Sequence, residues 1–236
     1  MKKILFHLKD DWAKYLIELF VVVFGILGAF TLEKWNESRK SREVEISYLK
    51  DIISCIQSDI VNLQFDLDRN NEAILGGEKM IEAIKQNQPY YDSLSLYFAS
   101  VNNYTGFESN KGAYESLKSI DLNIISNKTL RFSIINLYEK EYSTLKFNQA
   151  LITEDIHYLK RNFYPPFFDK FLVISPTSFY HGEMIPNDFE NLKKNKLFLY
   201  HLKSLQVDHE VYAKVISFKI KNLEKLVGDC MIEIER

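Results

Sequence analysis

The feature that most constrains this chain is a run of 18 residues, 15–32, in which Glu18 is the only charged side chain. As an α-helix rising about 1.5 Å per residue, the run is roughly 27 Å long, close to the thickness of a bilayer's hydrocarbon core. Trp12 and Tyr15 lie at its start and Trp35 just beyond its end, and such rings favour the membrane interface. We predict a short tail (1–14) and a transmembrane helix (15–35), with Trp12, Tyr15 and Trp35 as membrane-interface anchors.

Two other interpretations of this run remain open. A buried core helix normally keeps a polar stripe, but between residues 19 and 32 only Thr31 is polar. A cleaved signal peptide has its basic residues directly before a shorter apolar run and small residues at the cleavage site. Here the run begins late, and Leu27 occupies a position where a small residue is expected. The pattern favours an uncleaved signal-anchor.

Three residues of this helix are candidate contacts with another membrane helix. Gly25 and Ala29 are four residues apart and form a small-xxx-small pair that permits close approach. Glu18 is costly in hydrocarbon unless it reaches water or a partner. It either extends toward the headgroups and pairs with Lys14, four residues earlier, or contacts a second helix.

The charges around the helix do not decide its orientation. Four basic residues precede it and four follow it: Lys2, Lys3, Lys9 and Lys14 before, and Lys34, Arg39, Lys40 and Arg42 after. A short tail before a first apolar segment usually stays in the cytoplasm. We therefore expect a single-pass protein of the bacterial inner membrane, with the C-terminal part in the periplasm rather than the cytoplasm.

Composition places the rest of the chain among folded helical proteins. It is 236 residues long and 46% hydrophobic, with eight glycines and five prolines. The 30 basic and 32 acidic residues are interleaved, which argues against a nucleic-acid-binding surface. Cys55 and Cys230 fit neither a zinc nor a redox pattern. We expect two inert thiols, and a disulfide only if this part is exported and their helices pack side by side.

A long amphipathic helix is predicted for residues 36–86. Apolar residues repeat there at alternating spacings of three and four, which defines a seam: Ile46, Leu49, Ile53, Ile56, Ile60, Leu63 and Leu67. The seam packs either within the chain's own bundle or in a coiled coil between subunits. Gly76 and Gly77 follow in the same register and predict a kink or a break.

Residues 87–236 are predicted to form an antiparallel helical bundle. Asp92, Asn127, Asp188 and Asn195 are candidate helix N-caps. Pro165 and Pro166 should end a long helix near residue 161. The segment 164–188 is rich in aromatic residues, holds four of the five prolines, and is expected to be irregular. The fold class predicted is all-α: one N-terminal transmembrane helix continuing into a long helix, followed by the bundle.

No sequence motif predicts catalysis, a cofactor or a metal. The five histidines form no HExxH pattern; only His201 and His209, eight residues apart, share a helix face that a metal site could use. No phosphate-binding glycine loop and no nucleophile elbow occurs. We therefore expect no catalytic, cofactor or metal residues, and a protein that is not an enzyme.

Two blocks of sequence resemble a family of uncharacterised single-pass membrane proteins of Bacteroidota. The first is YxxE at Tyr15 and Glu18, VVxGILxAF over 22–30, and WNE over 35–37. The second runs from Gly112 to Glu139 and contains GAYESLKS, LNIISNKTLR and LYE. The resemblance implies a bacterial, membrane-anchored helical protein and supplies no catalytic residues.

Two functions are compatible with these features. The first is a membrane-anchored interaction or scaffold protein that acts through helix association, with the lipid bilayer, a homo-oligomer or a membrane protein as partner. The alternative is an extracytoplasmic small-ligand sensor that signals through a partner. A pocket with convergent polar groups would favour the sensor, whereas a filled core with exposed apolar residues would favour the scaffold.

Overall fold

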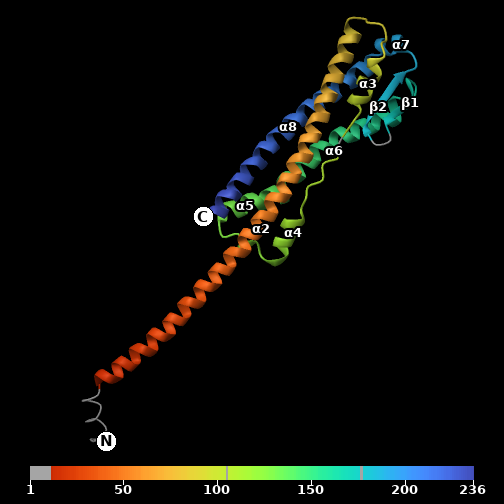
Figure 1. Cartoon of the computed structure of the whole chain (residues 1–236). Helices are drawn as coiled ribbons and strands as arrows, with labels where there is room; N and C mark the ends of the chain where they lie inside the picture. Colours follow the sequence, from red (N-terminus) through yellow and green to blue (C-terminus); the bar gives the residue numbers. More distant parts are fainter. Residues whose placement is uncertain (1–11, 105, 176–177) are drawn as a thin grey trace. The chain divides into compact units, whose positions relative to one another are not determined.

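The computed structural model describes residues 12–104, 106–175 and 178–236, without the side chains of Ala13, Tyr15 and 170–181. The chain is 83% helical, as the predicted all-α class requires, and Figure 1 shows its helices and its one small sheet. It divides into two compact units, Met1–Tyr48 and Leu49–Arg236. Part of the predicted amphipathic helix therefore belongs to the bundle unit.

Helix α2 runs without interruption from Trp12 to Lys85. No proline occurs in these 74 residues, so nothing removes a backbone donor from its hydrogen-bond ladder. The helix also continues through Gly76 and Gly77, and the predicted break is wrong. It ends where Asn87 adopts a positive φ of 51°, two residues before Pro89.

The two glycines instead mark close approaches of helix α2 to its neighbours. A Cβ at position 76 would lie 2.2 Å from Ser100 Oγ and 3.0 Å from the Tyr97 carbonyl oxygen, both on helix α3 (Ser93–Val101). A Cβ at position 77 would lie 3.4 Å from Gln206 Cβ, on helix α8 (Lys196–Glu235). Close packing against α3 and α8 accounts for the pair.

The middle of the chain follows the predicted order of short helices and turns. Asp92 precedes helix α3, but its side chain makes no capping bond. After α3 come α4 (Gly112–Ile120), the 3₁₀ turn η1 (Leu122–Ile124), α5 (Lys128–Asn136), the π-helical turn η2 (Leu137–Glu141), α6 (Tyr142–Tyr158) and the π-helical turn η3 (Leu159–Phe163). The helical course ends two residues before Pro165.

Residues 168–186 form a β-hairpin, where an irregular segment was predicted. Strands β1 (Phe168–Ser175) and β2 (Ser178–Pro186) are antiparallel, with Phe171 opposite Met184 and Val173 opposite Gly182. The prolines of this segment argue against strands in the sequence. However, Pro186 is the last residue of β2, a position where the missing backbone N–H of proline is tolerated. Phe168 lies against Phe98 of helix α3 at a centroid distance of 5.3 Å, which ties the hairpin to the bundle.

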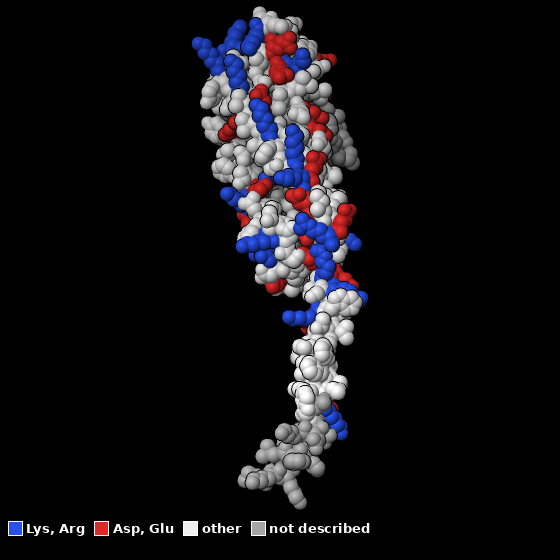
Figure 2. Space-filling view, turned by 90° about the vertical axis from the view of Figure 1, so that its left-hand side faces the viewer, with Lys and Arg blue, Asp and Glu red and all other residues white. Residues whose placement is uncertain are grey.

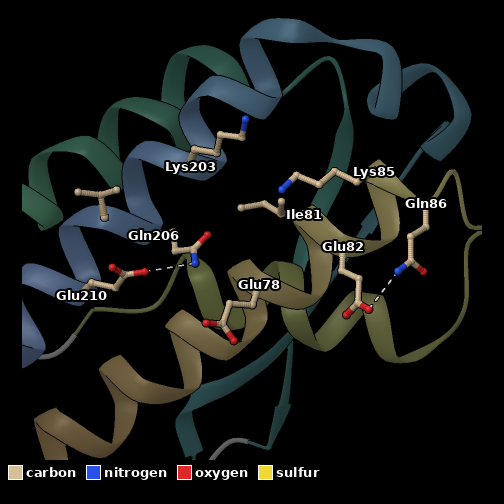
Figure 3. Close-up of a pocket in the computed structure, with 9 residues that line it drawn as sticks. Glu78, Ile81, Glu82, Lys85, Gln86, Lys203, Gln206 and Glu210 are labelled. Carbon is tan, nitrogen blue, oxygen red and sulfur yellow. Dashed lines mark hydrogen bonds between the residues drawn. The ribbon is translucent and has the colours of Figure 1, made fainter.

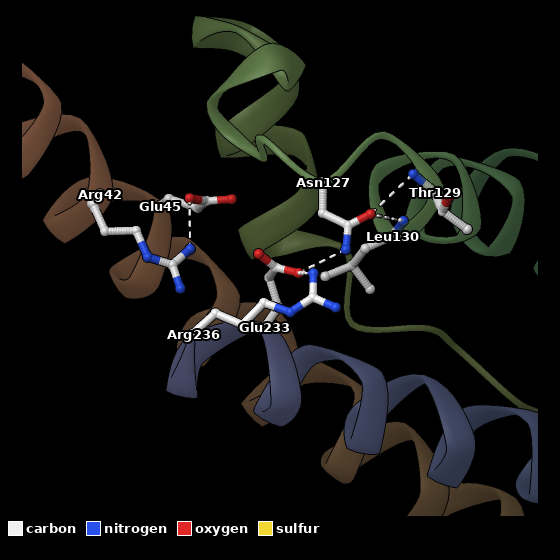
Figure 4. Close-up of polar contacts among 7 residues, drawn as sticks. All are labelled: Arg42, Glu45, Asn127, Thr129, Leu130, Glu233 and Arg236. Atoms are coloured by element: carbon white, nitrogen blue, oxygen red, sulfur yellow. Dashed lines mark hydrogen bonds and ion pairs between the residues drawn. The ribbon is translucent and has the colours of Figure 1, made fainter.

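Asparagine and aspartate begin the last helices as predicted. Asp188 accepts from the Asn191 amide at the start of α7 (Phe189–Lys194). Asn195 accepts from the amides of Leu197 and Phe198 at the start of α8. Asn127 caps α5 in the same way, and its Nδ2 also donates to Glu233 Oε2 at 2.6 Å, a carboxylate that Arg236 pairs with (Figure 4).

Helix α8 and the Leu49–Lys85 part of α2 run side by side in the bundle (Figure 1). The core is filled by aliphatic residues of α2 and by a row of aromatic rings. Tyr114 stacks on Tyr138 at 4.5 Å, and Tyr142 lies edge-on to Tyr138 at 5.5 Å. These three tyrosines are almost fully buried. Cys55 and Cys230 are free thiols, and burial raises the pKa of the Cys230 thiol to about 12.

Candidate functional site

The apolar part of helix α2 exposes its side chains on all sides. Within Leu16–Lys85, the 18-residue window of highest hydropathy has a mean value of 2.1, and none of it is buried. The helix is long and apolar enough to cross a membrane. Figure 2 shows this segment almost free of charge, whereas both signs of charge are interspersed over the visible face of residues 49–236.

The predicted membrane-helix contacts lie on this exposed segment. Glu18, Gly25 and Ala29 are all exposed, and no atom lies within 4 Å of a Cβ built at Gly25. Trp12 and Trp35 are exposed near its two ends. The side chain of Tyr15, the third predicted anchor, lies outside the described residues. A face with these small residues is accessible to another helix.

The seam residues of the bundle unit are occupied by the chain's own core. Leu49, Ile53, Ile56 and Leu63 are buried, Ile60 and Leu67 are half-buried, and in the other unit Ile46 is half-buried too. The packing agrees with the interpretation of the seam as one face of an intramolecular bundle. The buried seam residues are not accessible to a second subunit.

A groove with a volume of about 580 Å³ lies between helices α2 and α8. Its α2 side carries Glu78, Ile81 and Lys85, three residues and then four apart along the helix. Its α8 side carries the reverse series: Lys203, Gln206 with Val207, and Glu210. The spacing i, i+3 or i+4, i+7 brings each series onto one helix face.

The charges of this groove are separated into two ends. The helices are antiparallel, so the two lysines meet at one end and the two glutamates at the other. Figure 3 shows Lys85 and Lys203 extending toward each other above Ile81, with Glu78 and Glu210 at the opposite end. Gln206 donates to Glu210 at 3.3 Å. Glu82 turns away and interacts with Lys79 and Gln86.

The amino-acid sequence did not predict this groove. Its two sides are more than 100 residues apart in the sequence, and no motif predicts that they meet. The available signal was weak: EKMIEAIK over 78–85 and KSLQVDHE over 203–210 place opposite charges seven residues apart in opposite order. Such pairs are common on solvated helix faces.

Two buried titratable groups, Asp59 and His209, are engaged by other groups of the protein. Asp59 accepts from Tyr142 Oη at 2.6 Å and from the Asn110 amide at 2.8 Å. His209 has Nδ1 2.8 Å from Asn70 Oδ1 and Nε2 3.0 Å from the Val101 carbonyl oxygen. Burial lowers the pKa of His209 and raises that of Asp59. These contacts are structural.

The two histidines considered for a metal site have different surroundings. His209 is buried and its ring nitrogens face protein oxygens. His201 is half-buried, with its ring 4.9 Å from that of Phe163 and 5.6 Å from that of Tyr200. Among the described residues, no group of three or more histidine, cysteine or acidic residues is placed to hold a metal ion.

Fold and surface together define a helical protein with one exposed apolar helix and a bundle that carries a charged groove. A family model described as "Family of unknown function (DUF6090)" matches residues 18–170. Because this match covers more than half of the chain, the protein belongs to that family. The expectation of an uncharacterised family is confirmed at this level, whereas the Bacteroidota source and the two motif blocks stay predictions. No curated protein and no solved structure matches the chain.

Proposed function

We propose that this protein is a membrane-anchored helical interaction protein. The exposed apolar segment of helix α2 carries the proposal, because none of its most apolar 18-residue window is buried and the segment is long enough to cross a bilayer. In this proposal the segment anchors the protein, and the unit Leu49–Arg236 binds other proteins beside the membrane. Association between anchors would use the face of Gly25 and Ala29.

The filled core of the bundle favours this function over a small-ligand sensor. The side chains of Tyr114, Tyr138, Leu49, Ile52 and Ile56 occupy the bundle interior with almost no exposure. The α2–α8 groove has a volume in the range of small-molecule sites, but it lies open at the surface between two helices. An open groove with charged rims suits a polypeptide better than an enclosed metabolite.

We further propose that the protein has no enzymatic activity. Asp59 and His209 are buried groups of types that catalysis often uses, and burial shifts the pKa of each. Both are hydrogen-bonded to other buried residues, Asp59 to Tyr142 and His209 to Asn70. Their use in packing supports the proposal.

Membrane association is tested by comparing the full chain with a form that lacks residues 1–40. We expect the full chain to float with membranes after an alkaline wash, and the shortened form to remain in the soluble fraction with unchanged helical circular dichroism. A full chain released by the wash would refute the anchor. A shortened form that stayed with the membranes would show that another surface binds them.

We place the bundle unit on the periplasmic face of a bacterial inner membrane. A cysteine introduced at Arg236, in a chain with Cys55 and Cys230 replaced by alanine or serine, would report this orientation. In intact cells it should react with a thiol reagent that cannot cross the inner membrane. Labelling only after lysis would show that the bundle unit faces the cytoplasm, and it would not contradict the membrane anchor.

A further inference from the structure

The α2–α8 groove has features of a docking site for one particular shape of partner. Its charged residues at both ends lie two helical turns apart: Glu78 and Lys85 on α2, and Lys203 and Glu210 on α8. Seven residues at 1.5 Å each separate the ends by roughly 10 Å. The groove therefore has a cationic end and an anionic end at a spacing that another helix can match.

Three of these four charges have no partner among the residues that the structure describes. Among the residues that the structure describes, the side chains of Glu78, Lys85 and Lys203 form no hydrogen bond or ion pair. Glu210 accepts only the 3.3 Å bond from Gln206. Unpaired lysines brought together from two helices repel each other, and an acidic group between them would relieve that repulsion.

The floor between the two ends is apolar and partly open. Ile81 is 9% exposed and Val207 is 56% exposed. Gly77 allows α2 and α8 to approach closely beside Gln206, which makes the floor shallow. A shallow apolar strip between charged ends resembles the groove in which a third helix packs.

We propose that this groove binds an amphipathic helix of a partner protein, an inference that rests on the proposed interaction function. The matching helix carries an acidic residue for Lys85 and Lys203, a basic residue seven positions away for Glu78 and Glu210, and an apolar residue between them on Ile81 and Val207. A second copy laid along the groove in the same direction sets lysine against lysine. The charges therefore disfavour that arrangement, and the mass measurement below distinguishes an antiparallel second copy from a different chain.

The test uses the full-length protein in mild detergent and two synthetic helical peptides of three heptads. The first, labelled peptide carries Glu and Lys seven residues apart with Leu between them on one face. The second carries Lys at both positions. Fluorescence anisotropy should show the first peptide binding at least about tenfold more tightly than the second, because only the first complements both ends.

Charge reversal of the groove provides the decisive comparison. The double variant Lys85→Glu with Lys203→Glu should bind the first peptide about tenfold more weakly than the native protein does. It should bind the second peptide more tightly, because its groove is acidic at both ends. The control Lys50→Glu with Lys221→Glu changes one exposed lysine on each of the same helices outside the groove. It should keep the original preference. Val207→Asp should weaken both peptides, since it places a charge on the floor.

Three outcomes would overturn the inference. If the native protein binds both peptides equally, or if the groove and control variants prefer the same peptide, the charges of the groove do not select the bound helix. A doubled mass in detergent that disappears only in the Lys85→Glu, Lys203→Glu variant would assign the groove to a second copy. Membrane flotation of these variants separates the two proposals: floating variants without peptide preference refute the docking site and leave the anchor standing.

Discussion

Tyr142 donates a hydrogen bond from Oη to Asp59 Oδ2 at 2.6 Å, and both side chains are buried in the bundle core. The Asn110 amide donates to the other carboxylate oxygen at 2.8 Å. Helix α2 is thereby joined to α6 and to the loop before α4 through a single carboxylate. Because a buried carboxylate without donors is costly, this pair makes the relative position of these elements specific.

Replacing Tyr142 with phenylalanine should lower the free energy of unfolding by about 1–3 kcal/mol. The ring still fills the core, but Asp59 loses one of its two donors in a buried position. Urea denaturation followed by circular dichroism measures the change. Tyr200→Phe is the matched control, because Tyr200 is 65% exposed and its loss should cost less than about 0.5 kcal/mol. Equal costs would show that the Tyr142 hydroxyl contributes no specific stabilisation.

The carboxyl of Asp59 should make stability depend on pH. Burial raises its pKa above the usual value of 3.8, and the bonds from Tyr142 and Asn110 oppose this only in part. A raised pKa in the folded state gives stability that is fully present below 3.8 and is lost as pH rises through the folded pKa.

Asp59→Asn removes this dependence, since an amide can accept from the Asn110 amide and donate to Tyr142 without titrating. Its free energy of unfolding should rise relative to the native protein over the pH range that begins near 3.8 and ends at the raised pKa of the folded state. Denaturation curves at several pH values provide the measurement. A difference that stays constant over this range would contradict the raised pKa.

The adjacent glycines of helix α2 should respond in opposite directions to alanine. Gly76→Ala places a Cβ against Ser100 Oγ and the Tyr97 carbonyl oxygen and should destabilise the protein by about 1–3 kcal/mol. At Gly77 the nearest atom is 3.4 Å away, on the Gln206 side chain. Gly77→Ala should therefore be neutral or stabilise by up to about 1 kcal/mol through helix propensity.

A double variant separates crowding from propensity at these glycines. Adding Ser100→Ala to Gly76→Ala removes the nearer of the two obstructing atoms, so part of the lost stability should return. Thermal unfolding of the four forms in the cycle gives the coupling. If Gly76→Ala and Gly77→Ala have equal effects, the close approach to α3 does not control this position.

The small residues of the apolar segment should control association of the anchors. Gly25→Leu combined with Ala29→Leu is expected to weaken self-association in detergent by about tenfold, or ~1.4 kcal/mol, because bulky side chains keep the helices apart. The control Val23→Leu with Leu27→Ile changes another face of the helix at similar volume. Sedimentation or light scattering measures the mass, and equal dissociation of both variants would refute a specific contact.

Glu18 should be dispensable for insertion. It lies exposed on the helix, one turn after Lys14, where its carboxylate can reach the headgroup region. Glu18→Gln should leave flotation and oligomeric mass unchanged, whereas a loss of assembly with intact flotation would assign Glu18 to a contact between helices. Both measurements use the same detergent preparations as the Gly25 and Ala29 variants.

Local sequence determined the elements whose cause is local. The apolar run over 15–32, the caps Asn127, Asp188 and Asn195, and the stop before Pro165 all depend on residues within one or two turns of each other. The spacing of apolar residues predicted the seam. It did not predict whether the seam packs in the chain's own core or against a second subunit, because both arrangements bury the same helix face.

Tertiary structure decided the features that join distant segments. The two strands of the hairpin satisfy each other's backbone groups, and Phe168 packs against Phe98 of helix α3. A segment rich in proline and aromatic residues does not by itself predict either contact. From the sequence alone, Gly76 and Gly77 predict a kink or a break in the helix. Their role as sites of close packing is evident only from the positions of Ser100 and Gln206 in the folded protein. The charged groove arises only where α2 and α8 lie antiparallel, because its two ends combine charges from segments that meet solely through the fold of the bundle.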